Sequence, residues 1–335
     1  MSIYSKIHTK LSRKFKGYRR DVRYYLGLDK AFYNNARGSR ILIYHGICRD
    51  DHTRFNPIFL TAKIFEDHLK LYKKHCNVVS LDDYYKSNFS DGKFNICLTF
   101  DDGFANNHKY ALPLLEKYQV PATFFITGIA NEGYDILWND FLGIVSKYGP
   151  QTIYYKNEEY YKGKYDLYYS ADSRITLKDK LRVTGFDDKA DMMKELYALV
   201  PFKKEERHTD YWLQMTMAQI KELATSQYAT IGAHGYYHND LVQTSPEDAF
   251  TEMLNVKQYL EALIKKPITS LAFPYGSYNQ DVINEAKKAG YKQLLAMDFY
   301  NDRDGADETM RERLTVNPFI SPVNQLHATI TRKYD

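Results

Sequence analysis

The sequence predicts an α/β fold with a mostly parallel sheet, of a size common among one-domain barrels. Apolar runs typical of buried strands alternate with amphipathic segments typical of helices from residue 40 to near the C-terminus. The 335 residues are 44% hydrophobic and 26% charged, so the chain can bury a large core without disulfide or metal staples. This composition excludes collagen-like, coiled-coil and globally disordered proteins.

Each predicted element has its own sequence signal. Residues 41–44 are a continuous apolar run and residues 95–100 are mostly apolar, as expected for strands that are buried on both faces. Residues 61–75 carry apolar side chains three and four positions apart, the spacing of one helical face. The same signals predict further strands at 122–126, 229–233, 268–273, 292–297 and 313–316, and helices at 107–118, 217–224, 246–264 and 281–289.

Residues 135–212 interrupt this alternation. The segment is rich in Tyr, Lys and Asp, lacks clear period-2 strands, and is predicted to be partly helical near 189–199. We interpret it as an insertion, without chemistry of its own, into a domain that spans residues 40–330. The 31 tyrosines of the chain could stack on sugar rings, although Tyr more often fills a core or an interface.

Residues 1–39 form a basic N-terminal segment. Residues 1–40 contain eleven Lys or Arg and two Asp, a net charge of +9, which leaves −5 for the rest of the +4 chain. Apolar residues define one face of a predicted helix: Ile7, Leu11, Phe15, Tyr18, Val22 and Tyr25. Such a helix can lie on an anionic membrane through residues 1–38, or dock on the domain with its charges solvated. The acidic remainder and the lack of a recognised motif argue against nucleic acid as a partner.

The cysteines and the apolar runs bear on the compartment. Cys48, Cys76 and Cys97 are odd in number and lack metal-ligand spacing, so we expect reduced packing residues. The longest apolar stretch, 120–129, is about half of the roughly 20 residues that a membrane-spanning helix needs. The basic N-terminus lacks the apolar stretch of a signal peptide. These features predict a cytoplasmic protein, with peripheral membrane contact as an option.

Acidic and histidine side chains follow the predicted strands. Asp101 and Asp102 come directly after strand 95–100, where two adjacent carboxylates are costly to bury without a cation or a shared proton. His234 and His238 follow strand 229–233, four positions apart. Because the carboxyl ends of parallel strands meet at one edge, two histidines and one aspartate can form a catalytic zinc set with an open position for water.

Two further strand ends carry candidate residues. Pro274 and Tyr275 precede a glycine, and such a turn can aim a backbone N–H at a substrate oxygen. His45 follows strand 41–44 and could be a general acid, because the pKa of histidine lies near neutrality. Taken alone, each of these sites could equally be an ordinary turn or a structural histidine.

The motifs together resemble a known family. Thr-Phe-Asp-Asp-Gly at 99–103, His-x3-His at 234–238 and Pro-Tyr-Gly at 274–276 occur in the order found in the NodB homology domain. The chain thus resembles the polysaccharide deacetylases of carbohydrate esterase family 4 over roughly residues 41–320, apart from the insertion. The resemblance implies a distorted (β/α)7 barrel, which lacks one strand of the full eight.

The resemblance also implies roles for individual residues. Asp101 takes the place of the general base, and the residue after Pro274, Tyr275, takes the place of the backbone N–H donor to the oxyanion. A divalent metal would be held by Asp102, His234 and His238. Zinc is the metal that we expect first, with cobalt, nickel or manganese as alternatives, because a site of two imidazoles and one carboxylate suits several metals.

The chain departs from the family pattern in its supporting residues. Gly235 stands where Ser or Thr usually follows the first histidine. Ala272 stands where an Arg usually pairs with the base, and we expect Arg313, before the last strand, to substitute for it. The usual fourth motif is absent, although Asp298 could do part of its work.

The usual C-terminal acid is also missing, because Val316 occupies the position of the histidine. Some deacetylases of partially N-deacetylated surface polysaccharides carry this element at the start of the domain, and residues 41–45 resemble their N-terminal strand. This resemblance assigns the acid to His45.

We therefore predict a metal-dependent hydrolase that removes N-acetyl groups from an N-acetylated sugar in a polysaccharide or a lipid-linked glycan precursor. The same site would suit an O-acetyl esterase, a deformylase or an amidohydrolase of small amides. A non-catalytic glycan-binding protein on a deacetylase scaffold is a third hypothesis, motivated by the altered motifs and opposed by the intact Asp101.

Overall fold

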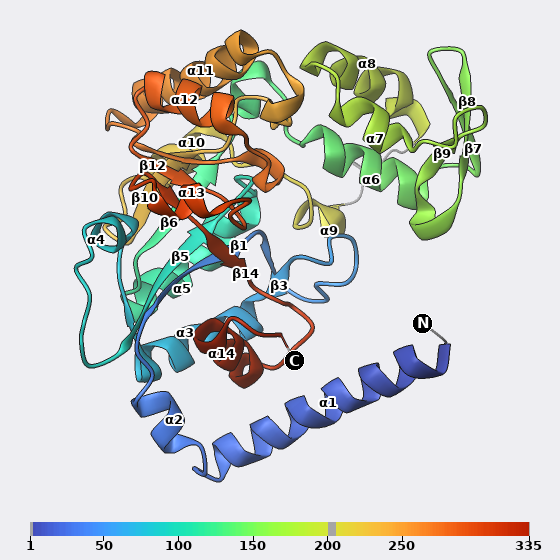
Figure 1. Cartoon of the computed structure of the whole chain (residues 1–335). Helices are drawn as coiled ribbons and strands as arrows, with labels where there is room; N and C mark the ends of the chain where they lie inside the picture. The colour runs from blue at the N-terminus through green and yellow to red at the C-terminus, as the bar shows by residue number, and fades with distance from the viewer. Residues whose placement is uncertain (1–2, 200–205, 335) are drawn as a thin grey trace.

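The computed structural model describes residues 3–199 and 206–334 (Figure 1). Within these ranges, nine strands form one parallel sheet in the order β13-β12-β11-β10-β6-β5-β1-β14, with β4 pairing with β5. The end strands β13 (Met310–Arg311) and β14 (Arg313–Thr315) are separated in the chain by Glu312 alone. The sheet therefore curls into a nearly closed barrel, and the predicted parallel α/β barrel is confirmed.

The strands end together on one rim of the barrel. β1 pairs with β5 so that Tyr44 lies opposite Phe100, and β6 pairs with β10 so that Ile126 lies opposite Ala233. The longer strands lie where the apolar runs predict them, because every residue of β5 and β6 is buried. The barrel strands are β1 (Ser39–Tyr44), β4 (Cys76–Val78), β5 (Phe94–Phe100), β6 (Ala122–Ile126), β10 (Ala229–Ala233), β11 (Ser270–Ala272) and β12 (Gln293–Leu295).

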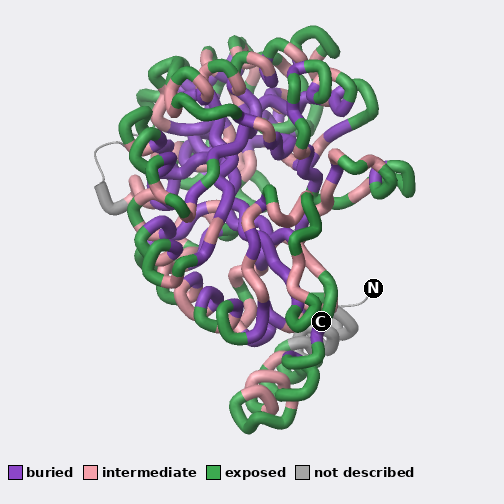
Figure 2. The backbone as a smooth tube through the Cα atoms, turned by 90° about the vertical axis from the view of Figure 1, so that its left-hand side faces the viewer, coloured by how far each residue is buried: buried purple, intermediate pink, exposed green. Residues whose placement is uncertain are grey.

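Helices cover the outside of this barrel (Figure 1), and the buried residues lie mainly in the interior of the molecule (Figure 2). Several begin at a Ser or Thr whose hydroxyl accepts a backbone N–H of the first turn, as at Thr61, Ser245 and Ser321. The helices are α3 (Ala62–His75), α4 (Leu81–Tyr85), α5 (Leu112–Tyr118), α10 (Met217–Leu223), α11 (Pro246–Ile264), α12 (Gln280–Lys288), α13 (Asp302–Ala306) and α14 (Pro322–Thr331). A short pair of strands, β2 (Ile47–Cys48) and β3 (Leu60–Thr61), follows β1.

The segment that we interpret as an insertion has its own small core, and it contains strands although its sequence shows no clear period-2 pattern. Its antiparallel sheet consists of β7 (Thr152–Tyr155), β8 (Glu158–Lys162) and β9 (Tyr168–Ser170). Along β7 exposed and buried residues do alternate, but over four residues that period is too short to identify from sequence. The helices of the segment are α6 (Trp138–Tyr148), α7 (Leu177–Arg182), α8 (Phe186–Leu196), which covers most of the predicted helical stretch, and α9 (Glu206–Thr209).

The N-terminal segment forms the predicted helix, α1 (Ile3–Tyr25), followed by α2 (Lys30–Asn34). The side chains of Ile7 and Leu11, predicted on its apolar face, lie outside the described residues. Among the described residues, no helix has the length and the apolar character that crossing a membrane requires. The three cysteines are buried and form no disulfide with one another.

Candidate metal and catalytic site

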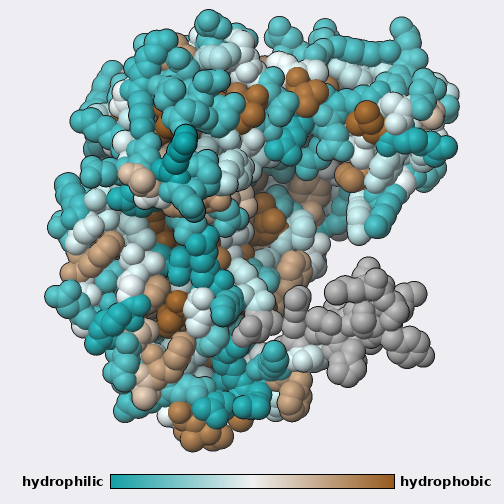
Figure 3. Space-filling view, in the orientation of Figure 1, coloured by the Kyte–Doolittle hydropathy of each residue, from teal (hydrophilic) through white to brown (hydrophobic). Residues whose placement is uncertain are grey.

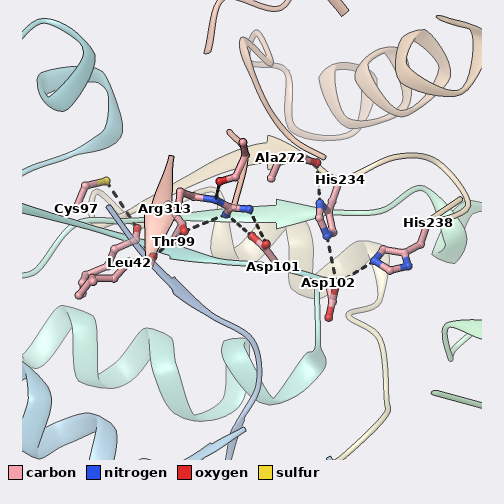
Figure 4. A network of polar contacts seen from close by, with 11 residues as sticks. Leu42, Cys97, Thr99, Asp101, Asp102, His234, His238, Ala272 and Arg313 are labelled. Atoms are coloured by element: carbon pink, nitrogen blue, oxygen red, sulfur yellow. Dashed lines mark hydrogen bonds and ion pairs between the residues drawn. The ribbon is translucent and has the colours of Figure 1, made fainter. Parts of the chain in front are cut away.

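The predicted site residues meet at the rim where the barrel strands end (Figure 4). Asp101 and Asp102 follow β5, and the backbone N–H of Asp101 donates to the Tyr44 carbonyl at the end of β1 (2.9 Å). His45, the next residue of that strand end, therefore lies beside the two carboxylates. On the other side of β5, the N–H of His234 donates to the Ile126 carbonyl at the end of β6 (3.0 Å).

Asp102, His234 and His238 form a buried set with the spacing of metal ligands. The Nε2 atoms of both histidines lie 3.3 Å from Oδ1 of Asp102, and one ligand atom from each residue falls within 4.8 Å of the others. Ligand atoms at the corners of a tetrahedron, with bonds of about 2.0–2.1 Å to zinc, are about 3.3–3.4 Å apart. Both distances between an imidazole nitrogen and the carboxylate oxygen therefore match those of a tetrahedral metal site.

The two imidazoles are held by contacts outside the metal set. Nδ1 of His234 lies 2.8 Å from the Ala272 carbonyl at the end of β11. When Nδ1 donates there, Nε2 is the nitrogen left to bind a cation, as a ligand requires. The indole N–H of Trp138, on α6 of the insertion, donates to the carbonyl of His238 (3.4 Å). The ligand loop is therefore supported both by the barrel and by the insertion.

Charge in this set is unevenly shared. Burial by itself would raise the pKa of Asp102, but hydrogen bonds from His234 and His238 hold it well below its ordinary value. Burial also opposes a charge on each imidazole; Asp101 and Asp102 nevertheless raise the pKa of His234, whereas burial prevails at His238 and lowers its pKa. The carboxylate is thus ionised and buried, an arrangement that a bound cation stabilises.

Arg313 pairs with Asp101 through two hydrogen bonds. From β14, its Nη1 and Nη2 donate to Oδ1 (2.7 Å) and Oδ2 (2.9 Å) of the carboxylate, and the pair is buried. The same guanidinium donates to Thr99 Oγ1 (3.2 Å) and to the Ala296 carbonyl (3.3 Å). Burial would raise the pKa of Asp101, but Arg313, together with His234 and His45, lowers it below its ordinary value. Asp101 is therefore held ionised.

Three non-glycine residues of the site adopt the left-handed backbone conformation. The φ angles are +73° at Asp102, +56° at His238 and +60° at Tyr275. Such conformations cost about 1–3 kcal/mol each and persist where the surrounding structure imposes them, often at functional sites. Here they place two ligands and the turn after β11 where regular strand or helix geometry would not.

Gly235 is required by the path of the ligand loop. Its φ is +73°, and a Cβ at this position would lie 3.0 Å from Glu252 Oε1 and 3.1 Å from Pro274 Cγ. The Ser or Thr of the family pattern would therefore be strained here. The close neighbour, Glu252, instead makes hydrogen bonds to this loop.

Glu252 on α11 is a supporting residue that sequence reasoning missed. Its carboxylate accepts the backbone N–H groups of Tyr237 (3.1 Å) and Asn239 (3.2 Å) and the side-chain amide of Asn239 (2.8 Å). The buried ammonium of Lys189, on α8 of the insertion, donates to the side-chain oxygen of Asn239. Burial lowers the pKa of Lys189 to about 8. No spacing pattern in the sequence singles out either residue.

Pro274 and Tyr275 begin the short 3-10 turn η7 (Pro274–Gly276) after β11. The centroid of the Tyr275 ring lies 4.7 Å from that of the His238 ring. The guanidinium of Arg182, from the insertion, lies over the same Tyr275 ring, 4.7 Å from its centroid. Arg182 is in turn fixed by Asp240, to which its Nε donates (2.7 Å). The motif turns are thus packed against each other and against the insertion.

Two further carboxylates differ from the sequence expectations. Asp298 lies outside the site, because its side chain is 75% exposed and pairs with Arg332 (3.1 Å). Asp140, which sequence reasoning did not select, is buried in the first turn of α6, and burial together with Asp102 raises its pKa well above its ordinary value. Asp140 lies near the site because α6 packs on the ligand loop, as the contact between Trp138 and His238 shows. The sequence does not reveal this packing.

Comparisons with known proteins agree with this geometry. A sequence model of the polysaccharide deacetylase family matches residues 90–153 and 202–294. A Bacillus subtilis (strain 168) protein, YxkH, whose name assigns it to the polysaccharide deacetylases, is 21% identical over 261 residues. The match covers 75% of this chain and 62% of YxkH, so the chain spans less than two thirds of that relative.

Two solved structures are similar in fold. The Streptococcus pyogenes deacetylase PplD, in complex with acetate, has a TM-score of 0.57 and 19% identity, covering 87% of this chain and 97% of that one. IcaB from Ammonifex degensii has a TM-score of 0.53 and 15% identity, covering 88% and 97%. At these identities the structures show a shared barrel fold.

Proposed function

The chain belongs to the polysaccharide deacetylase family, and we propose on this premise that it removes N-acetyl groups from an N-acetylated sugar by metal-dependent hydrolysis. The observation that carries the proposal is the adjacency of two differently equipped carboxylates. Asp102 faces two imidazoles at 3.3 Å, whereas its neighbour Asp101 faces the guanidinium of Arg313 at 2.7 Å. One carboxylate is thus equipped to hold a cation and the other to accept a proton.

The ligands in this proposal are Asp102, His234 and His238, with zinc as the metal that we expect first and cobalt, nickel or manganese as alternatives. A divalent cation bound there supplies Lewis-acid polarisation of the acetyl carbonyl and of the attacking water. The burial of all three side chains supports this assignment, because it limits solvation of the carboxylate in the absence of a cation.

The remaining residues handle protons and charge. Asp101 accepts the proton of the attacking water, and Arg313 keeps it ionised before that step. The backbone N–H of Tyr275, set by the turn that begins at Pro274, donates to the developing oxyanion. His45, at the end of the neighbouring strand β1, donates a proton to the departing sugar amine. The products are acetate and a free amino sugar.

The proposed substrate is an N-acetylated sugar in a polysaccharide or in a lipid-linked glycan precursor. The family supports carbohydrate as the substrate class. A lipid-linked substrate would suit a protein that contacts an anionic membrane through residues 1–38. The cytoplasmic location stays a prediction.

Replacing the proposed base tests the assignment. Asp101→Asn should lower acetate release from N-acetylated oligosaccharides roughly 10²–10⁴-fold, the usual contribution of general base catalysis, while metal content stays near wild type. Asp298→Asn, at an exposed carboxylate outside the site, is the control and should keep full activity. Equal turnover in Asp101→Asn and wild type would reject Asp101 as the base.

Product analysis separates the other hypotheses. Formate or ammonia in place of acetate would indicate a deformylase or a small-amide amidohydrolase, and acetate from O-acetylated but not N-acetylated sugars would indicate an esterase. Metal-loaded protein that binds glycans without any turnover would favour the non-catalytic hypothesis.

A further inference from the structure

α1 docks on the barrel through its polar side. On α14, the side-chain amide of Asn324 donates to the Gly17 carbonyl (3.1 Å) and to Asp21 Oδ1 (2.9 Å), and the Ser321 hydroxyl donates to the same Asp21 oxygen (2.6 Å). Near the end of the helix, the Tyr24 hydroxyl lies 2.7 Å from Nε2 of His75 on α3. Polar contacts therefore hold the helix in one orientation against the domain.

The apolar side of α1 faces away from these contacts. Phe15 is 67% exposed, Tyr18 69% and Tyr25 78%, and the turn that follows continues the surface with the exposed Leu26 and Leu28. Figure 3 shows apolar side chains gathered at the lower edge of this face of the molecule, where α1 gives way to the turn before α2. Figures 1 and 2 show the helix lying along the outside of the barrel, at the edge of the molecule.

This orientation discriminates between the two interpretations of the basic segment. A helix that merely covers the domain would bury its apolar stripe against it and leave its polar side in water. Here Gly17 and Asp21 meet the domain, and the aromatic stripe meets solvent. A contiguous exposed apolar surface of this kind is typical of an interaction site.

The charge around this stripe identifies the partner. Lys14, Lys16 and Arg19 are exposed beside the aromatic residues, within a segment of net charge +9. A second copy of the chain would bring another +9 to the same surface and would be repelled. Nucleic acid would be bound by the basic residues through its phosphates and gives no reason for exposed leucines. Anionic lipid matches both properties, because its headgroups attract Lys and Arg while its acyl chains accept Phe and Leu.

We propose that α1 and the turn through Leu28 form an interfacial membrane helix that binds an anionic bilayer in the plane of its surface. Phe15, Tyr18, Tyr25 and Leu26 lie in the boundary between headgroups and acyl chains, and the basic residues lie among the phosphates. Because polar contacts to α14 fix the helix on the barrel, binding holds the whole domain in one orientation on the membrane. This inference does not depend on the reaction that the barrel catalyses.

Vesicle co-sedimentation of the full chain tests the proposal. The probes are vesicles of phosphatidylcholine alone and of phosphatidylcholine mixed with phosphatidylglycerol. The wild type should bind the anionic vesicles, and added salt should weaken this binding. A variant with Phe15→Ser, Tyr18→Ser, Tyr25→Ser and Leu26→Ser keeps every charge and should bind roughly tenfold more weakly or worse.

The matched control changes four comparably exposed apolar residues of the insertion to serine: Tyr154, Tyr165, Ile175 and Val183. It should bind as the wild type does. A second variant, Lys14→Glu with Lys16→Glu and Arg19→Glu, should lose anionic binding while its apolar residues stay in place. All variants should release acetate from a soluble substrate at the wild-type rate, which separates this inference from the proposed function.

The proposal is overturned if the wild type binds neither kind of vesicle, or if the apolar variant binds the anionic vesicles as strongly as the control. A dimer in the absence of vesicles that the apolar variant converts to a monomer would also overturn it, because the stripe would then contact a second copy of the chain.

Discussion

Replacing Arg313 by Met removes the cationic partner of a buried carboxylate without changing the length of the side chain much. The side chains of Arg313 and Asp101 are 0% and 6% exposed, and two hydrogen bonds of 2.7 and 2.9 Å join them. In the variant, Asp101 stays buried but loses its counter-charge. The change thus measures how strongly the barrel depends on this pair.

The expected cost at neutral pH is large. Removing one partner of a buried ion pair destabilises a protein by about 3–5 kcal/mol, because the other charge is left uncompensated. A domain is stable by about 5–15 kcal/mol, so Arg313→Met should fold but with much of its stability lost. The double variant Asp101→Asn, Arg313→Met removes both charges, and its free energy of unfolding should exceed the value expected from adding the two single losses.

The pH dependence has a defined sign. The folded-state pKa of Asp101 is below its ordinary value, so the pair stabilises the fold above the pKa of the unfolded carboxyl, and this stability is lost as pH falls through the folded pKa. The gap between wild type and Arg313→Met should therefore shrink on acidification. In the enzyme assay, the variant should lose activity at a higher pH than wild type on the acidic side, because Asp101 no longer has the guanidinium that favours its ionised form.

Urea denaturation at neutral and acidic pH and the pH profile of acetate release measure both effects. Arg311→Met is the matched control. The Arg311 guanidinium donates to the backbone carbonyls of Glu308 and Met310, in contrast to that of Arg313, which donates to a buried carboxylate. The reasoning is refuted if Arg313→Met lies within about 1 kcal/mol of wild type at neutral pH and its acidic limb is unmoved.

Three further predictions concern the ligand loop and the core. Glu252→Gln should weaken metal binding roughly 10–100-fold in a competition with a chromophoric chelator, because it removes a charged acceptor that orients the loop, whereas Glu247→Gln on the same helix should not. Gly235→Ser should destabilise by at least about 1 kcal/mol in thermal or urea unfolding, because of its positive φ and the contact with Glu252; an unchanged or raised stability would contradict the account of that loop. Burial lowers the pKa of His68 to about 3, so metal-free protein should lose up to about 1.4 kcal/mol per pH unit as pH falls from the unfolded pKa of about 6.5 to about 3, and His68→Gln should show a flatter dependence in urea unfolding.

The residues at strand ends were accessible to prediction for a geometric reason. Parallel strands finish at one edge, so any polar residue directly after an apolar run is placed near the others of its kind. Asp101, Asp102, His234 and His45 all follow such runs, and the structure brings them to one rim. The apolar runs themselves predicted the barrel strands well, because strands buried on both faces need continuous hydrophobic residues.

The residues that prediction missed contact the site through tertiary packing. Glu252 lies within a helix that has several acidic residues, and Lys189 lies in a segment without recognisable motifs. What distinguishes them is burial against the ligand loop, and burial of a single charged residue leaves no periodic trace in a sequence. The insertion was underestimated for the same reason, since Trp138 and Arg182 support motif turns more than 90 residues further along the chain.

The two substituted motif positions show why losses at a motif do not by themselves imply a lost function. At Ala272 the guanidinium expected beside the base is missing, yet Arg313 from β14 donates to the same carboxylate. At Gly235 a hydroxyl is missing, yet Glu252 from α11 accepts the N–H groups of that loop. In the first case another strand supplies a guanidinium to Asp101, and in the second a helix supplies a hydrogen-bond acceptor to the loop. The interactions that matter are therefore defined by position in space and not by position in a motif.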